Sequence, residues 1–140
     1  MTLYLDTSAL VPLFLAETRS ADIERAILSD DAGVAVSDFA IGEFGAAISK
    51  AVRMDRLTPA QAKMVLADCD AWTRGGMAPL STSPADIRLA SAFVRQFDLK
   101  LLLPDAIHIA TCRAHGFTLM TLDTGQADAA AALGVAVILP

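Results

Sequence analysis

Short apolar runs alternate with segments of helical periodicity along the whole chain. This alternation is typical of βαβ units, in which each helix returns the chain to the start of the next parallel strand. We therefore predict a three-layer α/β/α sandwich with a mainly parallel central sheet, formed by a single domain over residues 1–140. The predicted strands are residues 3–5, 34–36, 77–81, 117–121 and 135–139, and the predicted helices are residues 8–15, 20–28, 38–53, 59–74, 84–97, 104–115 and 126–133.

The ends and faces of these helices carry recognisable signals. Thr58 and Gln61 form a capping box around Pro59 at the first helical position, and Gly75 and Gly76 end the same helix. Helical spacing also predicts which side chains face the core. They are Ile41, Phe44, Ile48 and Val52 in the third helix, Ala62, Val65, Leu66, Cys69 and Trp72 in the fourth, and Ile87, Ala90, Val94 and Phe97 in the fifth.

Composition indicates a well-packed globular protein. Hydrophobic residues make up 54% of the 140 residues and charged residues 19%, which excludes a disordered or fibrous chain. The mean hydropathy of +0.49 is high for a small monomer, so we expect another subunit or a partner to cover apolar surface. No apolar stretch reaches the roughly 20 residues of a membrane span, and the amino terminus does not resemble a signal peptide. We therefore expect a cytoplasmic protein without membrane association, with Cys69 and Cys112 reduced and buried.

Four carboxylates stand near the points where predicted strands give way to helices. They are Asp6, Glu43, Asp105 and Asp123. In open α/β sheets, ligands bind in the crevice at the carboxyl ends of the strands, so these acids are expected to converge there. Each like-charge pair at a separation of ~4 Å costs about 4 kcal/mol at an effective dielectric constant near 20. A divalent cation would relieve that repulsion, and an all-oxygen ligand set favours Mg²⁺ or Mn²⁺.

Each acid also has an ordinary explanation, because carboxylates are favoured in the first turn of a helix. Asp38 and Asp128 are weaker candidates for contact with a metal. His108, one turn after Asp105, is expected to be a satisfied core or rim histidine. Three hydroxyls can support the site by bonding to the acids or to a water on the metal, or can simply occupy a helix start or strand end. They are Thr7, Ser8 and Thr121.

The net charge of −5 argues against a conventional nucleic-acid binder with a basic face. That objection weakens if a bound metal neutralises several acids, because the net charge describes the metal-free chain. Lys50, Arg53, Arg56 and Lys63 lie close together in the sequence. They can face phosphates or form an ordinary solvated helix surface.

Four sequence blocks resemble the PIN domain, and within it the VapC toxins of prokaryotic toxin–antitoxin pairs. The blocks are YLDTSAL at 4–10, SDFAIGEF at 37–44, LPDAIHIA at 103–110 and TLD at 121–123. The resemblance covers essentially the whole chain and implies a metal-dependent endoribonuclease. It assigns Asp6, Glu43, Asp105 and Asp123 to one or two Mg²⁺ or Mn²⁺ ions that activate water for attack on an RNA phosphodiester.

The resemblance also implies partners. A small cognate antitoxin would neutralise the protein, often by inserting a basic side chain into the acidic crevice, and homodimers or larger complexes with the antitoxin are expected. The apolar helices between Phe39 and Trp72 are the predicted contact surface.

Two other functions remain open at this point. A non-catalytic PIN-like module that only binds RNA or protein could keep all four acids. A phosphoryl-transfer domain with an aspartyl nucleophile is the second alternative, but Asp6-Thr7-Ser8 lacks the second acid two positions on, and no receiver-like lysine follows a late strand.

Overall fold

The computed structural model describes residues 1–29 and 33–140. At its centre is a four-stranded sheet in the order β2-β1-β3-β4, and every pairing in it is parallel. The strands are β1 (Thr2–Leu5), β2 (Gly33–Ala35), β3 (Thr118–Met120) and β4 (Val137–Ile138). The predicted α/β sandwich with a parallel sheet is confirmed.

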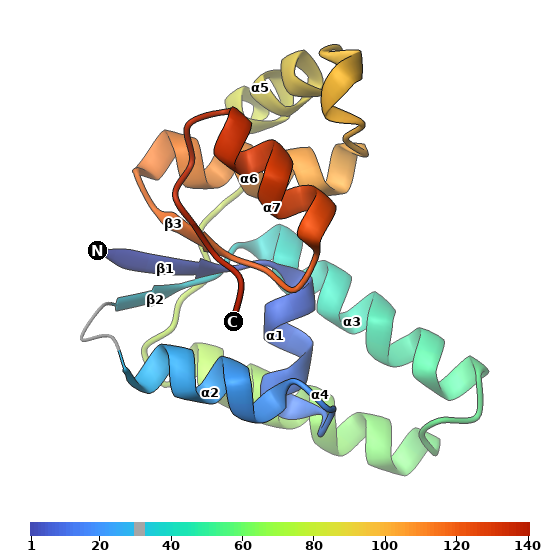
Figure 1. Ribbon diagram of the computed structural model, residues 1–140. Helices are drawn as coiled ribbons and strands as arrows, with labels where there is room; N and C mark the ends of the chain where they lie inside the picture. The colour runs from blue at the N-terminus through green and yellow to red at the C-terminus, as the bar shows by residue number, and fades with distance from the viewer. Residues whose placement is uncertain (30–32) are drawn as a thin grey trace.

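Helices cover both faces of this sheet (Figure 1). One layer contains the first four of the described helices, and the other contains the last three. A short 3₁₀ turn between α5 and α6, η1 (Phe97–Leu99), was not predicted. The first layer is α1 (Thr7–Phe14), α2 (Ser20–Leu28), α3 (Asp38–Arg53) and α4 (Pro59–Arg74). The second is α5 (Pro84–Val94), α6 (Leu103–His115) and α7 (Thr124–Ala132).

The central strand β1 shows why the sheet is apolar on both sides. Leu3 and Leu5 pack into the core beneath α1 to α4, whereas Tyr4 between them packs into the second core beneath α5 to α7. Successive side chains of a strand point to opposite faces, so a strand covered on both faces has no polar side. This arrangement explains the continuous apolar runs that mark the strands in the sequence.

Capping residues set where the helices next to the sheet begin. The side chain of Asp6 accepts a hydrogen bond from the backbone N–H of Ala9 and starts α1, and Ser37 caps α3 in the same way. The capping box around Pro59 forms as predicted at the start of α4. Gly116, with φ of 69°, ends α6 in the left-handed conformation that glycine adopts without steric cost.

The predicted strand at residues 77–81 is wrong. Only a single parallel bridge joins Leu80 to Ser37, with the Leu80 N–H donating to the carbonyl of Val36. Pro79 has no N–H and cannot contribute to a ladder, so the segment pairs at one point only.

The predicted inner face of α5 is confirmed at Ala90 and Val94, which pack into the second core, and is wrong at Ile87 and Phe97. Asp86, Ala90 and Phe93 are buried, whereas Ile87 is exposed and Phe97 lies beyond the helix with 87% of its surface accessible. The reason is that the Asp86 carboxylate accepts from the backbone N–H of Ser83 and closes a capping box. This bond turns residue 86 inward, and residues 90 and 93 follow it at helical spacing.

Both cysteines are buried free thiols, as predicted. Burial raises the pKa of Cys69 to about 11, and it raises the pKa of Cys112 as well. Within residues 1–29 and 33–140, the helices are too short or too polar to cross a bilayer.

Phe44 provides a test of the core beneath α1 to α4. It is 1% exposed, and its ring packs edge-on against Phe14 with centroids 5.6 Å apart. We expect Phe44→Ala to lower the free energy of unfolding by about 3–5 kcal/mol in urea titrations, because the cavity collapses only in part. The matched control, Phe97→Ala, removes an exposed ring and should change stability by less than about 0.5 kcal/mol. Equal effects of the two substitutions would contradict the described packing.

Candidate active site

The connections that follow the neighbouring strands β1 and β3 run to opposite faces of the sheet. After β1 the chain enters α1 and α2 on one face, whereas after β3 it enters α7 on the other. Adjacent strands whose connections leave to opposite faces open a crevice at their carboxyl ends. Asp6 follows β1 there, and its backbone N–H donates to the carbonyl of Met120 at the end of β3 over 3.2 Å.

Asp6 is the innermost carboxylate of this crevice, with 3% of its surface exposed. Its Oδ1 accepts from the Ser8 hydroxyl at 2.7 Å and from the Ala9 N–H at 3.0 Å, and its Oδ2 accepts from the Thr121 hydroxyl at 2.6 Å. Burial raises the pKa of Asp6 above its usual value, and the hydrogen bonds offset part of that shift. Two of the predicted supporting hydroxyls, Ser8 and Thr121, therefore bind the first acid directly.

Glu43 reaches the crevice from the second turn of α3 and is half-buried. Its Oε1 accepts from the third predicted hydroxyl, Thr7, at 2.7 Å and lies 2.6 Å from Nε2 of His108. Partial burial raises the pKa of Glu43, but the hydrogen bonds from His108 and Thr7 outweigh it and lower the pKa below its usual value. Glu43 is thus held as a carboxylate.

A chain of buried hydrogen bonds runs from α3 through β1 to Glu43. The Tyr4 hydroxyl lies 2.7 Å from the Ser37 hydroxyl and 2.8 Å from Nδ1 of His108. An ionised carboxylate only accepts, so Nε2 of His108 is the donor to Glu43. In the neutral ring Nδ1 is then an acceptor, which makes Tyr4 its donor and Ser37 the donor to Tyr4. Burial raises the pKa of Tyr4 and keeps its proton in place.

His108 is the residue whose part in the site the sequence did not reveal. It is buried and fully satisfied, as expected of a core histidine, yet one of its partners is the carboxylate of Glu43. Its position one turn after Asp105 was the available signal. Tyr4 offered a second one, because a tyrosine inside an apolar strand needs a buried partner for its hydroxyl.

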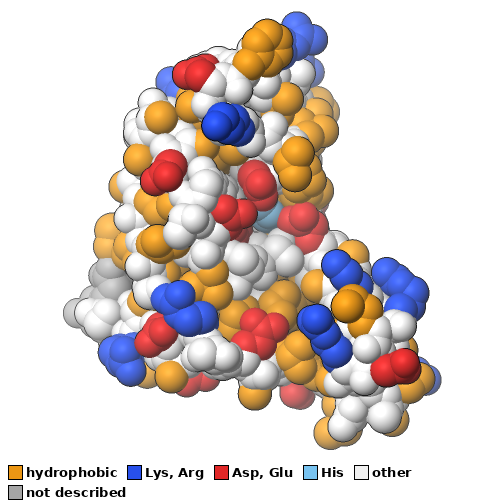
Figure 2. Space-filling view, turned by 45° about the vertical axis from the view of Figure 1, so that its right-hand side comes forward, with side chains coloured by type: hydrophobic (Ala, Val, Ile, Leu, Met, Phe, Trp, Pro, Cys, Tyr) orange, Lys and Arg blue, Asp and Glu red, His pale blue; other side chains and the backbone are white. Residues whose placement is uncertain are grey.

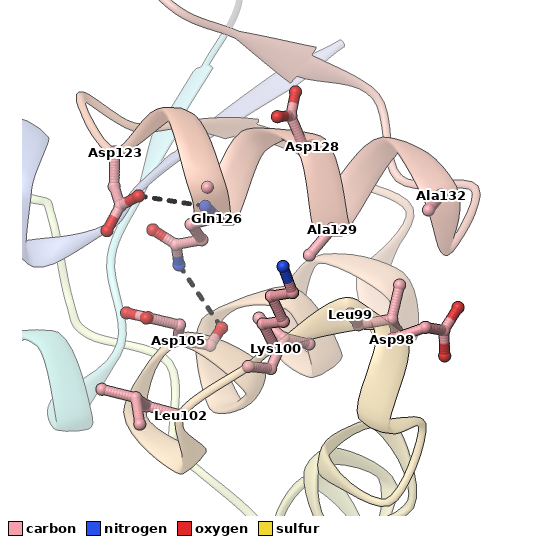
Figure 3. Close-up of a pocket in the computed structure, with 12 residues that line it drawn as sticks. Asp98, Leu99, Lys100, Leu102, Asp105, Asp123, Gln126, Asp128, Ala129 and Ala132 are labelled. Atoms are coloured by element: carbon pink, nitrogen blue, oxygen red, sulfur yellow. Dashed lines mark hydrogen bonds between the residues drawn. The ribbon is translucent and has the colours of Figure 1, made fainter.

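Asp105 and Asp123 approach the same crevice from the starts of α6 and α7. Asp123 is the N-cap of α7, where its Oδ1 accepts from the Gln126 N–H at 3.0 Å. The Gln126 side-chain amide in turn donates to the backbone carbonyl of Asp105 over 3.3 Å and joins the two helices (Figure 3). Gln126, which the sequence did not single out, also lies 2.9 Å from the Thr121 hydroxyl through its Oε1.

The four acids act on one another electrostatically. Burial raises the pKa of Asp105, and the negative charges of Asp123, Asp6 and Glu43 raise it further, while His108 opposes them. Figure 2 shows acidic side chains around a hollow in which a histidine is visible. The structure thus places Asp6, Glu43 and Asp123 close enough to Asp105 for their charges to act on it.

The donor set has the chemistry of a hard-cation site, because its ligating atoms are carboxylate oxygens. As the side chains stand, no three Asp, Glu, His or Cys groups in residues 1–29 and 33–140 lie close enough to hold one ion together. Several carboxylate oxygens of the predicted ligands nevertheless accept no hydrogen bond from the described protein. They are Oε2 of Glu43, Oδ2 of Asp123 and both carboxylate oxygens of Asp105.

The weaker acidic candidates lie outside this constellation. Asp38 accepts hydrogen bonds from the backbone and hydroxyl of Thr82 and fastens the start of α3 to the segment before α5. Asp128 lines the same gap as Asp105 and Asp123, but its carboxylate extends from α7 away from Asp105 (Figure 3). Two of the predicted basic residues, Lys50 and Arg53, lie in the last turn of α3, at the opposite end of the helix from Asp38.

The chain is thus an open parallel α/β protein, a class that binds ligands at the carboxyl ends of the strands where the winding reverses. In this chain acidic side chains lie at that edge. The model of the PIN domain family matches residues 3–132 of the chain. The protein therefore belongs to the PIN domain family, as the sequence blocks implied. No curated protein gives a significant match.

Solved structures share the fold over nearly the full length. The toxin VapC20 of Mycobacterium tuberculosis, described as cleaving the sarcin–ricin loop, is 18% identical with a TM-score of 0.73, and the match covers 99% of both chains. VapBC2 from Rickettsia felis, bound to promoter DNA, is 13% identical with a TM-score of 0.72 and covers 99% of this chain and 98% of its own. FitAcB from Neisseria gonorrhoeae is 19% identical with a TM-score of 0.72, covering 97% and 96%.

The hydrogen bond from His108 to Glu43 can be tested by measuring the pKa of Glu43. We expect His108→Phe, which keeps a buried ring but removes the Nε2 donor, to raise the pKa of Glu43 in a side-chain NMR titration. Thr7→Val should raise it too, since it removes the second donor. Thr82→Val, the control, should raise the pKa of Asp38 and leave that of Glu43 where it was. An unchanged Glu43 pKa in His108→Phe would contradict the hydrogen-bond chain.

Proposed function

We propose that this protein is a metal-dependent endoribonuclease and the toxin of a VapBC-type toxin–antitoxin pair. The observation that carries the proposal is the gathering of four mutually interacting carboxylates at the switch point of the sheet. Membership of the PIN domain family and the likeness to VapC structures, one of them described as an RNA-cleaving toxin, support it. The proposal treats residues 1–140 as one PIN-like domain working in the cytoplasm.

In this proposal Asp6, Glu43, Asp105 and Asp123 are catalytic and hold Mg²⁺ or Mn²⁺. When bound, the ion supplies the Lewis acidity that activates a water for in-line attack on the phosphodiester and that stabilises the leaving oxygen. The protein itself supplies orientation. Ser8 and Thr121 fix Asp6. Thr7 and His108 both donate to Oε1 of Glu43, so Oε2 has no partner in the described protein.

The proposed protein partners are a small cognate antitoxin and a second copy of the chain. A groove of about 460 Å³ runs between the end of α1 and the second half of α3, lined by both apolar and charged side chains. It overlaps the helical surface between Phe39 and Trp72 that was predicted for the antitoxin, and it has Met54, an exposed hydrophobic residue, on its border. The acidic hollow is the complementary place for a basic antitoxin side chain.

Cleavage itself is the direct test. We expect the purified protein to cut RNA with Mg²⁺ or Mn²⁺ and to lose the activity with EDTA. Asp6→Asn should lower the rate by about 10²-fold or more, because it removes a charged group from the centre of the site. Glu17→Gln, an exposed acid outside the crevice, is the control and should cleave normally. A folded protein that binds RNA but never cuts it under these conditions would be the non-catalytic alternative.

Asp105→Asn separates a catalytic acid from a structural cap. The raised pKa of Asp105 means that the folded protein binds its proton more tightly than the unfolded chain does. Its contribution to stability is therefore fully present below the usual value near 3.8 and is lost as the pH rises through the raised value. We expect metal-free Asp105→Asn to match or exceed the wild-type Tm at pH 7, with the difference vanishing in acid, while RNA cleavage is abolished. A less stable variant that still cleaves in proportion to its folded fraction would make Asp105 a cap.

A further inference from the structure

The acidic crevice continues into a second gap that the proposed chemistry does not use. This gap has a volume of about 500 Å³ and lies between the loop that enters α6 and one face of α7. Asp105 and Asp123 stand at one end of it, so it shares its border with the site (Figure 3). Its α7 wall contains three small residues, Gly125, Ala129 and Ala132, together with Gln126 and Asp128.

Lys100 is the one basic residue among the described residues that line this gap. Its ammonium group extends into the space between the loop and α7 (Figure 3). Asp98 and Asp128 also line the gap, but their carboxylates point away from this ammonium group. No carboxylate of the described chain lies within salt-bridge distance of Lys100. Its charge is therefore available to a ligand.

The backbone at Lys100 adopts a conformation that its residue type does not favour. Its φ of 53° and ψ of 36° place it in the left-handed region at the end of η1, where glycine or asparagine is usual. The conformation aims the side chain back across the gap. A strained, non-glycine residue beside a candidate site is the kind of observation that points to function.

We infer that Lys100 forms a phosphate-binding subsite that holds the RNA strand next to the scissile bond. The inference rests on the proposed nuclease function, because it takes the RNA backbone as the ligand. An RNA strand entering the crevice must place phosphates on either side of the one that reacts, and the gap leads directly from Asp105 and Asp123 to Lys100. A single ammonium group attracts a phosphate whichever base the nucleotide carries. The subsite therefore contributes affinity without sequence preference.

The test compares RNA binding and RNA cleavage in the same set of variants. Binding of short labelled oligo(U) and oligo(A) is measured by fluorescence anisotropy in Ca²⁺, a hard cation that suits carboxylate oxygens. Lys100→Gln should weaken binding of both oligonucleotides by about three- to fivefold. The slope of log affinity against log salt should fall by about 0.7, the value for one lost single-strand phosphate contact. In cleavage assays with Mn²⁺, KM should rise by a similar factor while kcat changes less than twofold.

Three further variants separate charge from structure. Lys100→Arg should bind as the wild type does, and so should Arg88→Gln, an exposed residue of α5 outside the gap. Lys100→Gly should bind as weakly as Lys100→Gln while its Tm equals or exceeds that of the wild type, because glycine adopts the left-handed backbone without strain. A lower Tm in Lys100→Gly with unchanged RNA binding would overturn the subsite and make Lys100 a structural residue.

The two proposals fail separately. Wild-type protein that cleaves RNA while Lys100→Gln binds and cleaves equally well would overturn the subsite and leave the nuclease intact. Wild-type protein that binds RNA through Lys100 but never cleaves it would overturn the nuclease and leave the subsite. Absence of any RNA binding by the wild type would overturn both.

Discussion

The hydrogen bond between Thr121 and Asp6 is the contact on which the site depends. Asp6 follows β1 and Thr121 follows β3, so their 2.6 Å bond ties the two central strands together at their carboxyl ends. A carboxylate as deeply buried as Asp6 is costly to ionise unless donors surround it, and three donors are present. The hydrogen bond from one of them, the Ala9 N–H, also caps the start of α1. The contacts that make the charge tolerable are therefore the same ones that shape the crevice.

The four acids fall into two pairs with different surroundings. Asp6 and Glu43 are held from several sides by hydroxyls, a histidine and a backbone N–H, and they have little freedom to reorient. Asp105 and Asp123 belong to helix starts, and most of their oxygens have no partner in the described protein. Asp6 and Glu43 are therefore held by more hydrogen bonds than the two acids at the rim, at the starts of α6 and α7. The Gln126 amide, which joins α6 to α7, limits how far the rim can open.

Much of this arrangement was predictable because it follows from local rules. Apolar runs covered on both faces marked β1 and β3, capping residues marked the helix starts, and a parallel sheet obliges strand ends to meet at one edge. This reasoning predicted that Asp6 and Asp123, which are far apart in the sequence, lie at the same edge of the sheet. The hydroxyls of Ser8 and Thr121 were predicted as supports, and both contact Asp6.

What the sequence did not yield depended on contacts between distant segments. The bond from His108 to Glu43 requires the relative placement of α3 and α6, which no local pattern encodes. One carboxylate determined which face of α5 is buried. Asp86 accepts the capping-box hydrogen bond from Ser83 and does not face solvent. The segment at 77–81 looked like a strand by composition, yet Pro79 limits it to one bridge. In each case a specific polar contact or a missing N–H overrode the apolar pattern.

The net charge of −5 is the remaining physical objection to a polyanionic substrate, and the structure shows why it carries little weight. At physiological salt the Debye length is about 8 Å, so a substrate in the crevice responds to the charges around it and not to the sum over the surface. Four of the acids lie at the site itself, where a divalent ion would oppose them. In the adjoining gap the Lys100 side chain extends inward, while the carboxylates of Asp98 and Asp128 point away from it. The overall negative charge therefore does not decide which ligand the crevice and the adjoining gap accept, because the local charges at the site do.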